Sequence, residues 1–167
     1  CVDAKQYNMD VNLMRKLPVG IQTFEKIRRE NFLYVDKTAL MWQIAAKSAP
    51  CFLSRPRRFG KSLLLSTFEA YFEGKRELFE GLAAEQLENE WNVHPVLHLD
   101  LNAEKYDRPE ALDAMLSNHL TQWESVHGKG EDETTLSRRF AGVIRRACEQ
   151  TGRGVVVLVD EYDKPLL

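Results

Sequence analysis

Residues 51–74, CFLSRPRRFGKSLLLSTFEAYFEG, contain the clearest structural signal in this amino-acid sequence. A short apolar run at 50–54 predicts a buried strand, and the basic segment after it predicts a loop. From Lys61 onward the pattern becomes helical, and Gly74 ends it. The residues at helical spacing are Leu64, Leu65, Phe68 and Phe72. A strand, a loop and a helix are therefore expected in succession.

The loop matches the second half of the phosphate-binding pattern G-x-x-x-x-G-K-[ST], with Arg55 in place of the first glycine. In such a loop, backbone N–H groups and the positive end of the following helix hold nucleotide phosphates. Gly60 would permit close approach, Lys61 would reach the β- and γ-phosphates, and the Ser62 hydroxyl would bind Mg²⁺. The alternative is a basic loop that caps a helix by chance. The position between an apolar strand and an apolar-striped helix favours the phosphate loop.

The neighbours of this triplet complete the candidate nucleotide-binding set. Phe59 and Leu63 flank Gly60, Lys61 and Ser62 on either side. Arg57 and Arg58 belong to the same set, either touching phosphates or lying in solvent, and the long charged side chains favour solvent.

A second signal begins with the aliphatic residues 155–159. A strand that is apolar on both faces is typical of a parallel sheet covered by helices. Asp160 follows this strand directly and would act on Mg²⁺ through water, whereas Glu161 would orient or deprotonate an attacking water. A buried strand that ends in surface acids is the alternative. Because two half-motifs occur in the expected order, ATP binding with Mg²⁺ is favoured.

The rest of the chain alternates strands and helices. Residues 32–35 predict a short strand, followed by a helix for which Asp36 and Thr38 offer caps. Residues 94–101 alternate in polarity and predict an edge strand. The helix after Thr38 covers about 40–45, and further helical patterns lie around 78–87, 112–123 and 136–147. This order predicts an α/β fold with a mainly parallel sheet between layers of helices.

Composition limits the class of protein. The 167 residues are 44% hydrophobic and 29% charged, which fits one soluble domain. A net charge of −2 gives no basic field for nucleic acid, and no apolar run is long enough to span a membrane. The scattered cysteines favour a reducing cytoplasm over a disulfide framework or zinc site; they are Cys1, Cys51 and Cys148.

Three other groups have a functional and a structural interpretation. His94, His98 and Asp100 would share a strand face and could hold a metal, but polar residues on an edge strand are the favoured interpretation. The acidic residues 131–133 indicate a solvated loop. Tyr34 could stack on a nucleotide base, or it could belong to an apolar strand ahead of a helix cap.

Four motifs together resemble the AAA-ATPase-like family. They are Leu17-Pro-Val-Gly-Ile-Gln-Thr-Phe24, Tyr34-Val-Asp-Lys-Thr38, Arg55-Pro-Arg-Arg-Phe-Gly-Lys-Ser62 and Leu158-Val-Asp-Glu-Tyr-Asp-Lys-Pro165. In that family an arginine-rich loop without the first glycine is usual. The resemblance implies a three-layer P-loop sandwich, with residues 1–30 as an N-terminal extension and 31–167 as the N-terminal part of the ATPase domain.

The same resemblance implies parts that this sequence does not contain. Family members continue into two further strands and then a restriction-nuclease-like domain, so we expect the protein to extend beyond Leu167, with one new strand between the phosphate-loop strand and the acidic strand. Contact with nucleic acid would depend on that later domain. An arginine finger would come from the later part or from self-association, so this part alone should hydrolyse ATP weakly. Adenine preference also rests on the resemblance.

Three functions are compatible with these residues. The first is a Mg²⁺-dependent ATPase, in which Lys61 and Glu161 are catalytic and Ser62 and Asp160 hold the metal. The second is a nucleotide-operated switch that controls an attached nuclease-like domain without rapid turnover. A small-molecule kinase is a third possibility, but the sequence shows neither an acceptor pocket nor a lid.

Overall fold

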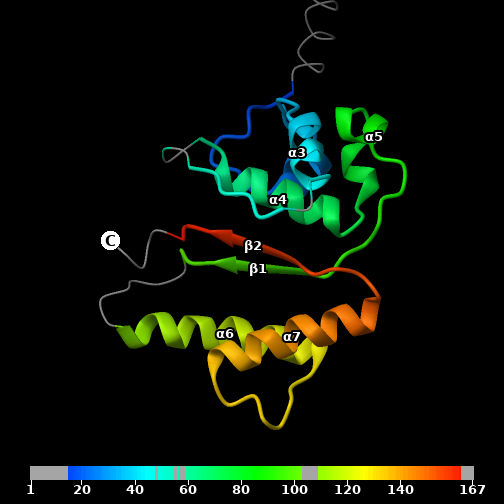
Figure 1. The fold of residues 1–167 in the computed structure, drawn as a ribbon. Coiled ribbons are helices and arrows are strands. Elements are labelled where there is room, and N and C mark those ends of the chain that lie inside the picture. Colours follow the sequence, from blue (N-terminus) through cyan, green and yellow to red (C-terminus); the bar gives the residue numbers. More distant parts are fainter. Residues whose placement is uncertain (1–14, 48, 55, 57–58, 103–108, 163–167) are drawn as a thin grey trace, which may run out of the picture. The chain divides into compact units, whose positions relative to one another are not determined.

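The computed structural model describes residues 15–47, 49–54, 56, 59–102 and 109–162. Its elements, in chain order, are α2 (Phe24–Arg29), α3 (Thr38–Ala45), α4 (Lys61–Phe72), the 3-10 helix η1 (Arg76–Phe79), α5 (Ala83–Leu87), β1 (Val96–Asp100), α6 (Pro109–His127), α7 (Leu136–Thr151) and β2 (Val156–Asp160) (Figure 1). The described residues divide into two compact units. The first contains the chain up to Ala70 together with Arg76–Asn89, and the second contains Tyr71–Lys75 and the chain from Glu90 onward.

The first unit has an aromatic core around α2. Phe24 and Ile27 are completely buried, and the ring of Phe24 lies between those of Tyr34 and Phe79, with centroids 5.1 and 4.9 Å away. From α2, Arg28 also donates to the carbonyl oxygen of Leu78, 2.7 Å away, which ties α2 to η1. The residues assigned from sequence to an N-terminal extension therefore supply part of this core.

Asp36 and Thr38 organise the start of two helices. The N-cap position of α3 is Lys37, and Thr38, which the sequence offered as a cap, is the first residue of that helix. One carboxylate oxygen of Asp36 accepts from the Thr38 N–H and hydroxyl, at 2.8 and 2.7 Å. The other accepts from the Ala83 N–H, and the buried Thr38 hydroxyl accepts from the Ala84 N–H. Because N-terminal N–H groups of a helix lack partners within the helix, these bonds fix α3 and α5 together.

Two predicted strands are wrong. Residues 32–35 and 50–54 are not strands, and the sheet of the described residues contains β1 and β2 alone. An extended apolar run becomes a strand only where a neighbouring strand takes its hydrogen bonds. Within 50–54, Phe52 is 67% exposed, so this run is not buried as the sequence suggested.

The second unit contains the predicted parallel pairing. β1 and β2 run parallel in register, so that Val96 faces Val156 and Asp100 faces Asp160. Figure 1 shows α6 and α7 side by side along this pair of strands. Val157 and Val159 remain 41% and 39% exposed, so β2 is less covered than its apolar sequence predicted. The α/β class is confirmed, with a two-stranded sheet in the described residues.

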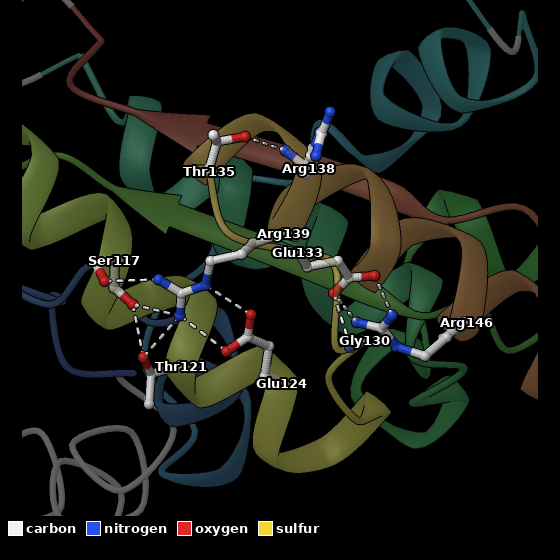
Figure 2. Close-up of polar contacts among 9 residues, drawn as sticks. All are labelled: Ser117, Thr121, Glu124, Gly130, Glu133, Thr135, Arg138, Arg139 and Arg146. Carbon is white, nitrogen blue, oxygen red and sulfur yellow. Dashed lines mark hydrogen bonds and ion pairs between the residues drawn. The ribbon is translucent and has the colours of Figure 1, made fainter.

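Two arginine–carboxylate pairs join α7 to its neighbours (Figure 2). Arg139 binds both oxygens of Glu124 on α6, at 2.7 and 2.8 Å, and Arg146 binds both oxygens of Glu133 in the preceding loop. The solvated loop predicted at 131–133 is therefore wrong for Glu133, which is 9% exposed. Gly142 makes room for it, since a Cβ there would overlap the carboxylate.

Among the described residues, no helix has both the length and the apolar composition needed to cross a membrane.

Candidate functional site

The start of α4 carries the first half of the predicted site. Gly60 adopts a positive φ of 73°, and α4 begins at the next residue, Lys61. A left-handed conformation is easy for glycine and strained for other residues. The N–H of Leu64 bonds to the Gly60 carbonyl at 3.0 Å, which closes the first helical turn. Helix geometry leaves the N–H groups at such a start without acceptors inside the helix, so they favour an anion.

Lys61, Ser62 and Leu63 form this first turn, and all three are partly exposed. Phe59, directly before Gly60, is 63% exposed. Arg57 and Arg58 lie outside the described residues. The geometry can therefore present a cation, a hydroxyl and main-chain donors from one short segment.

Two hydroxyl residues hold α4 within the first unit. Ser66 accepts a 3.0 Å hydrogen bond from the N–H of Phe24, and so caps α2 from α4. Thr67 is 1% exposed, and its hydroxyl donates to the carbonyl oxygen of Leu63 at 2.8 Å. Tyr34 shares a hydrogen bond with the same Thr67 hydroxyl. The two hydroxyls thus join α4 to segments far away in sequence.

Tyr34, which the sequence placed near the nucleotide, lies partly buried against Phe24. Burial raises the pKa of its phenol and outweighs the hydrogen bond with Thr67, and the nearby Asp36 raises that pKa further. The hydroxyl is therefore neutral at physiological pH and acts as a hydrogen-bonding group.

Asp36 behaves differently from Tyr34. Burial raises the pKa of its carboxyl, but the hydrogen bonds from Thr38 and from the Ala83 N–H lower it more, so the pKa lies below its ordinary value. Asp36 is consequently ionised at neutral pH and stays available to the N–H groups that it caps.

The carboxyl ends of β1 and β2 carry the second half of the predicted site. Asp160 is 8% exposed and lies beside Asp100, its partner in the parallel register. Its carboxylate accepts from the N–H of Glu161 at 2.9 Å. Glu161 has a positive φ of 51°, a conformation that costs a non-glycine residue about 1–2 kcal/mol. Ligands of open α/β sheets bind at such strand ends.

The two halves of the predicted nucleotide site belong to different units. Lys61 and Ser62 are in the first unit, Asp160 and Glu161 are in the second, and the structure describes each pair within its own unit.

The histidines suggested as metal ligands have other surroundings. His94 precedes β1, and its Nδ1 lies 2.9 Å from the carbonyl oxygen of Gly154. Its ring also packs edge-on against Phe72. Within the described ranges, no three histidine, cysteine or acidic side chains gather as a metal site. Asp100 instead lies next to Asp160.

Comparison with known proteins gives the family. Residues 18–167 match the family described as predicted AAA-ATPase, which is most of the chain and includes the four motifs except for Leu17. The chain belongs to the predicted AAA-ATPase family. Membership suggests nucleotide binding and possible ATPase activity, with ATP and Mg²⁺ as the implied cofactors. No solved structure matched this AAA-ATPase-like chain significantly.

Most of the chain is also similar to a longer bacterial protein. The AAA-ATPase-like chain is 42% identical over 157 residues to the "Uncharacterized protein in vnfD 5'region" of Azotobacter chroococcum mcd 1. The match covers 92% of this chain and 30% of that relative. The chain therefore spans about a third of the length of this relative.

Sequence reasoning missed two features of the site region. No role was predicted for Ser66 and Thr67, although a pair of hydroxyl residues inside an otherwise apolar pattern often marks side-chain to backbone bonds. Asp100 was grouped with histidines, although it ends one parallel strand just as Asp160 ends the other. Carboxyl ends of parallel strands lie at one edge of a sheet, and this signal was available in the sequence.

Proposed function

We propose that this chain forms the nucleotide-binding part of a Mg²⁺-dependent ATPase. In this proposal the phosphates of ATP bind the main-chain donors at the start of α4, with Lys61 opposite the β- and γ-phosphates. Phe59, Gly60, Ser62 and Leu63 complete that contact, joined by Arg57 and Arg58. Asp160 and Glu161 supply the acidic side.

The observation that carries the proposal is the backbone at Gly60. Its φ of 73° turns the chain into a twelve-residue helix that starts with Lys61. No described atom lies within 4 Å of a Cβ built on Gly60, which leaves room for a ligand against the backbone. A helix start with an adjacent ammonium group favours a multiply charged anion. A triphosphate is the anion that the family suggests.

The available oxygen donors fit magnesium. Mg²⁺ usually binds one or two carboxylates together with substrate phosphates and keeps several waters. The Ser62 hydroxyl and the Asp160 carboxylate are donors of this kind, and Asp160 is largely buried. Bound Mg²⁺ would neutralise charge on the phosphates.

Glu161 is the proposed general base. As water attacks the γ-phosphorus, an O–P bond forms, the bond from that phosphorus to the bridging oxygen breaks, and ADP leaves. The carboxylate of Glu161 takes the proton from the attacking water. The strained φ of Glu161 supports this role, because backbone strain concentrates at functional sites.

The remainder of the proposal concerns the whole protein. We expect further strands to complete a three-layer P-loop sandwich and to extend the sheet of β1 and β2. The relative is about three times longer than the matched region, so an added domain that contacts nucleic acid is compatible with it. Self-association that supplies an arginine finger belongs to the same proposal. So does a cytoplasmic location, which the free thiols of Cys51 and Cys148 support.

The test uses the full-length protein and measures binding of labelled ATP and release of phosphate. Lys61→Ala should lower the turnover rate by about 10²–10³-fold, because one charge-stabilising donor is lost. Glu161→Gln should bind ATP as the parent does and lower turnover by about 10²–10⁴-fold, as expected for a lost general base.

Exposed residues of the same types serve as controls. Lys47→Ala and Glu110→Gln should leave both measurements unchanged. If Lys61→Ala and Glu161→Gln hydrolyse ATP as fast as the parent, the assignment is wrong. Tight binding without turnover in the parent would favour the nucleotide-operated switch.

A further inference from the structure

A continuous set of hydroxyl contacts connects Tyr34 to the first turn of α4. The hydroxyls of Tyr34 and Thr67 share a hydrogen bond, and the Thr67 hydroxyl donates to the Leu63 carbonyl at 2.8 Å. Leu63 is the third residue of α4 and belongs to the proposed phosphate-binding turn. Tyr34 therefore reaches that turn through Thr67.

The position of Thr67 separates this contact from the phosphates themselves. Thr67 is six residues after Lys61, which corresponds to about 9 Å along the helix axis. Thr67 is 1% exposed, so its bonds are shielded from competing water. The Tyr34 ring also packs edge-on against Phe24, whose N–H bonds to Ser66 on α4. Tyr34 and α2 thus hold α4 at adjacent residues.

We propose that Tyr34 is a positioning residue, which acts through Thr67 to fix the first turn of α4 for phosphate binding. This inference rests on the proposed function for its consequence in ATP binding. The claim that Tyr34 fixes the first turn of α4 does not depend on nucleotide binding. A tyrosine whose hydroxyl is engaged by Thr67 and whose ring edge meets Phe24 is oriented by the protein interior, which is the arrangement that a positioning residue requires.

The first measurement needs no nucleotide. Amide hydrogen exchange of residues 64–67 in the full-length protein reports how firmly the first hydrogen-bonded turn of α4 is closed. Tyr34→Phe keeps the ring and removes the hydroxyl, and it should speed this exchange about fivefold, the effect of one net hydrogen bond. Thr67→Val should do the same, whereas Thr67→Ser keeps a hydroxyl and should restore parent behaviour.

A matched control tests the same chemistry in another helix. Thr151 donates its hydroxyl to the Ala147 carbonyl in α7, as Thr67 does to Leu63 in α4. Thr151→Val should leave exchange at 64–67 unchanged. In the double variant, Tyr34→Phe should not speed exchange beyond the effect of Thr67→Val, because both substitutions remove the same hydrogen bond between residues 34 and 67. Parent-like exchange in Tyr34→Phe, or additive effects in the double variant, would overturn the inference.

The second measurement is the affinity for Mg²⁺-ATP and Mg²⁺-GTP. Tyr34→Phe should weaken both about fivefold and leave their ratio unchanged, since the phosphate contacts are common to both nucleotides. A residue that stacks on the base would behave oppositely: Tyr34→Phe would bind as the parent does, and Tyr34→Ala would change the ratio. That result would overturn the inference. If the parent binds no nucleotide, the proposed function fails, and the exchange measurement still decides whether Tyr34 positions α4.

Discussion

The helices of the two units are joined by different kinds of buried contact. In the first unit, α4 is held by the hydroxyls of Ser66 and Thr67, and the starts of α3 and α5 are held by Asp36 and Thr38 bound to backbone N–H groups. In the second unit, α7 is held by two bidentate arginine–carboxylate pairs, Arg139 with Glu124 and Arg146 with Glu133 (Figure 2). The first unit therefore depends on hydroxyl links and on helix caps, including the ionised Asp36, and the second depends on bidentate ion pairs.

The difference has a physical consequence. A buried neutral group that loses its hydrogen-bond partner costs about 1–3 kcal/mol. A buried charge that loses its partner is expensive, and the pair must be kept whole. We therefore expect loss of one hydroxyl contact to cause local unfolding around α4. Removal of one ionic partner should instead destabilise α6 and α7 together.

The largest effect is expected from Arg139→Ala. Arg139 also donates to the Ser117 hydroxyl at 2.7 Å, and its removal leaves Glu124 buried without its cation. We expect the free energy of unfolding to fall by about 3 kcal/mol, at the low end for a broken buried pair because α7 lies near the surface. Urea unfolding followed by circular dichroism measures this loss.

Arg138 provides the matched control, because it is the exposed neighbour of Arg139 on the same helix. Arg138→Ala should change stability by less than about 0.5 kcal/mol. Equal losses in the two variants would show that the ionic pair contributes nothing beyond helix propensity or surface charge.

A smaller effect is expected from Gly142→Ala. Alanine is a better helix former by about 1 kcal/mol, but the added methyl would overlap the Glu133 carboxylate. We expect a net loss of about 1–3 kcal/mol, which is typical of overpacking. In a Glu133→Ala background the same substitution should become neutral or favourable, since the obstacle is gone. If Gly142→Ala still lowers stability in that background, the loss does not come from overlap with the Glu133 carboxylate.

Much of the fold was predictable because the helices carry strong local patterns. The predicted helix from Lys61 appears as α4, and the two amphipathic helices appear as α6 and α7. The parallel strand predicted at 155–159 appears as β2, because a continuous aliphatic run favours a parallel sheet, but β2 is less covered than this pattern predicted. The strands at 32–35 and 50–54 failed because strand formation depends on partners, which a local pattern cannot supply.

The motif predicted the helix start at Lys61, whereas the contacts that support α4 were not predictable, and the roles of the site residues stay predictions. Gly60 and Lys61 follow a motif whose chemistry requires them at one position each, and α4 starts where that motif expects it. The bond between Tyr34 and Thr67 joins residues 33 positions apart and has no local signature. Glu133 was misread because its partner, Arg146, lies on the next helix. Gly142, a glycine inside a helix, was the available clue.

Acid provides the final way to separate the two kinds of contact. The hydrogen bonds from Arg146 and from the Gly130 N–H lower the pKa of Glu133 from its ordinary 4.5 to about 2. A carboxyl whose pKa is lower in the folded than in the unfolded state stabilises fully above about 4.5, and that contribution declines as the pH falls toward 2. The hydrogen bond from Arg139 lowers the pKa of Glu124 in the same direction. Below pH 4.5 the α6–α7 pair should therefore lose protection against amide exchange sooner than α4, which is held by the hydroxyls of Ser66 and Thr67.

Glu133→Gln isolates this contribution, with Glu131→Gln in the exposed part of the loop as its control. At pH 6 the Glu133 variant should be less stable than the parent, because the bidentate pair is gone. The difference should narrow between pH 4.5 and 2, where protonation removes the same charge from the parent, and Glu131→Gln should follow the parent throughout. A stability difference that stays constant across this range would mean that the loss in Glu133→Gln does not depend on the ionisation of Glu133. The proposed reliance of the second unit on charge would then be wrong.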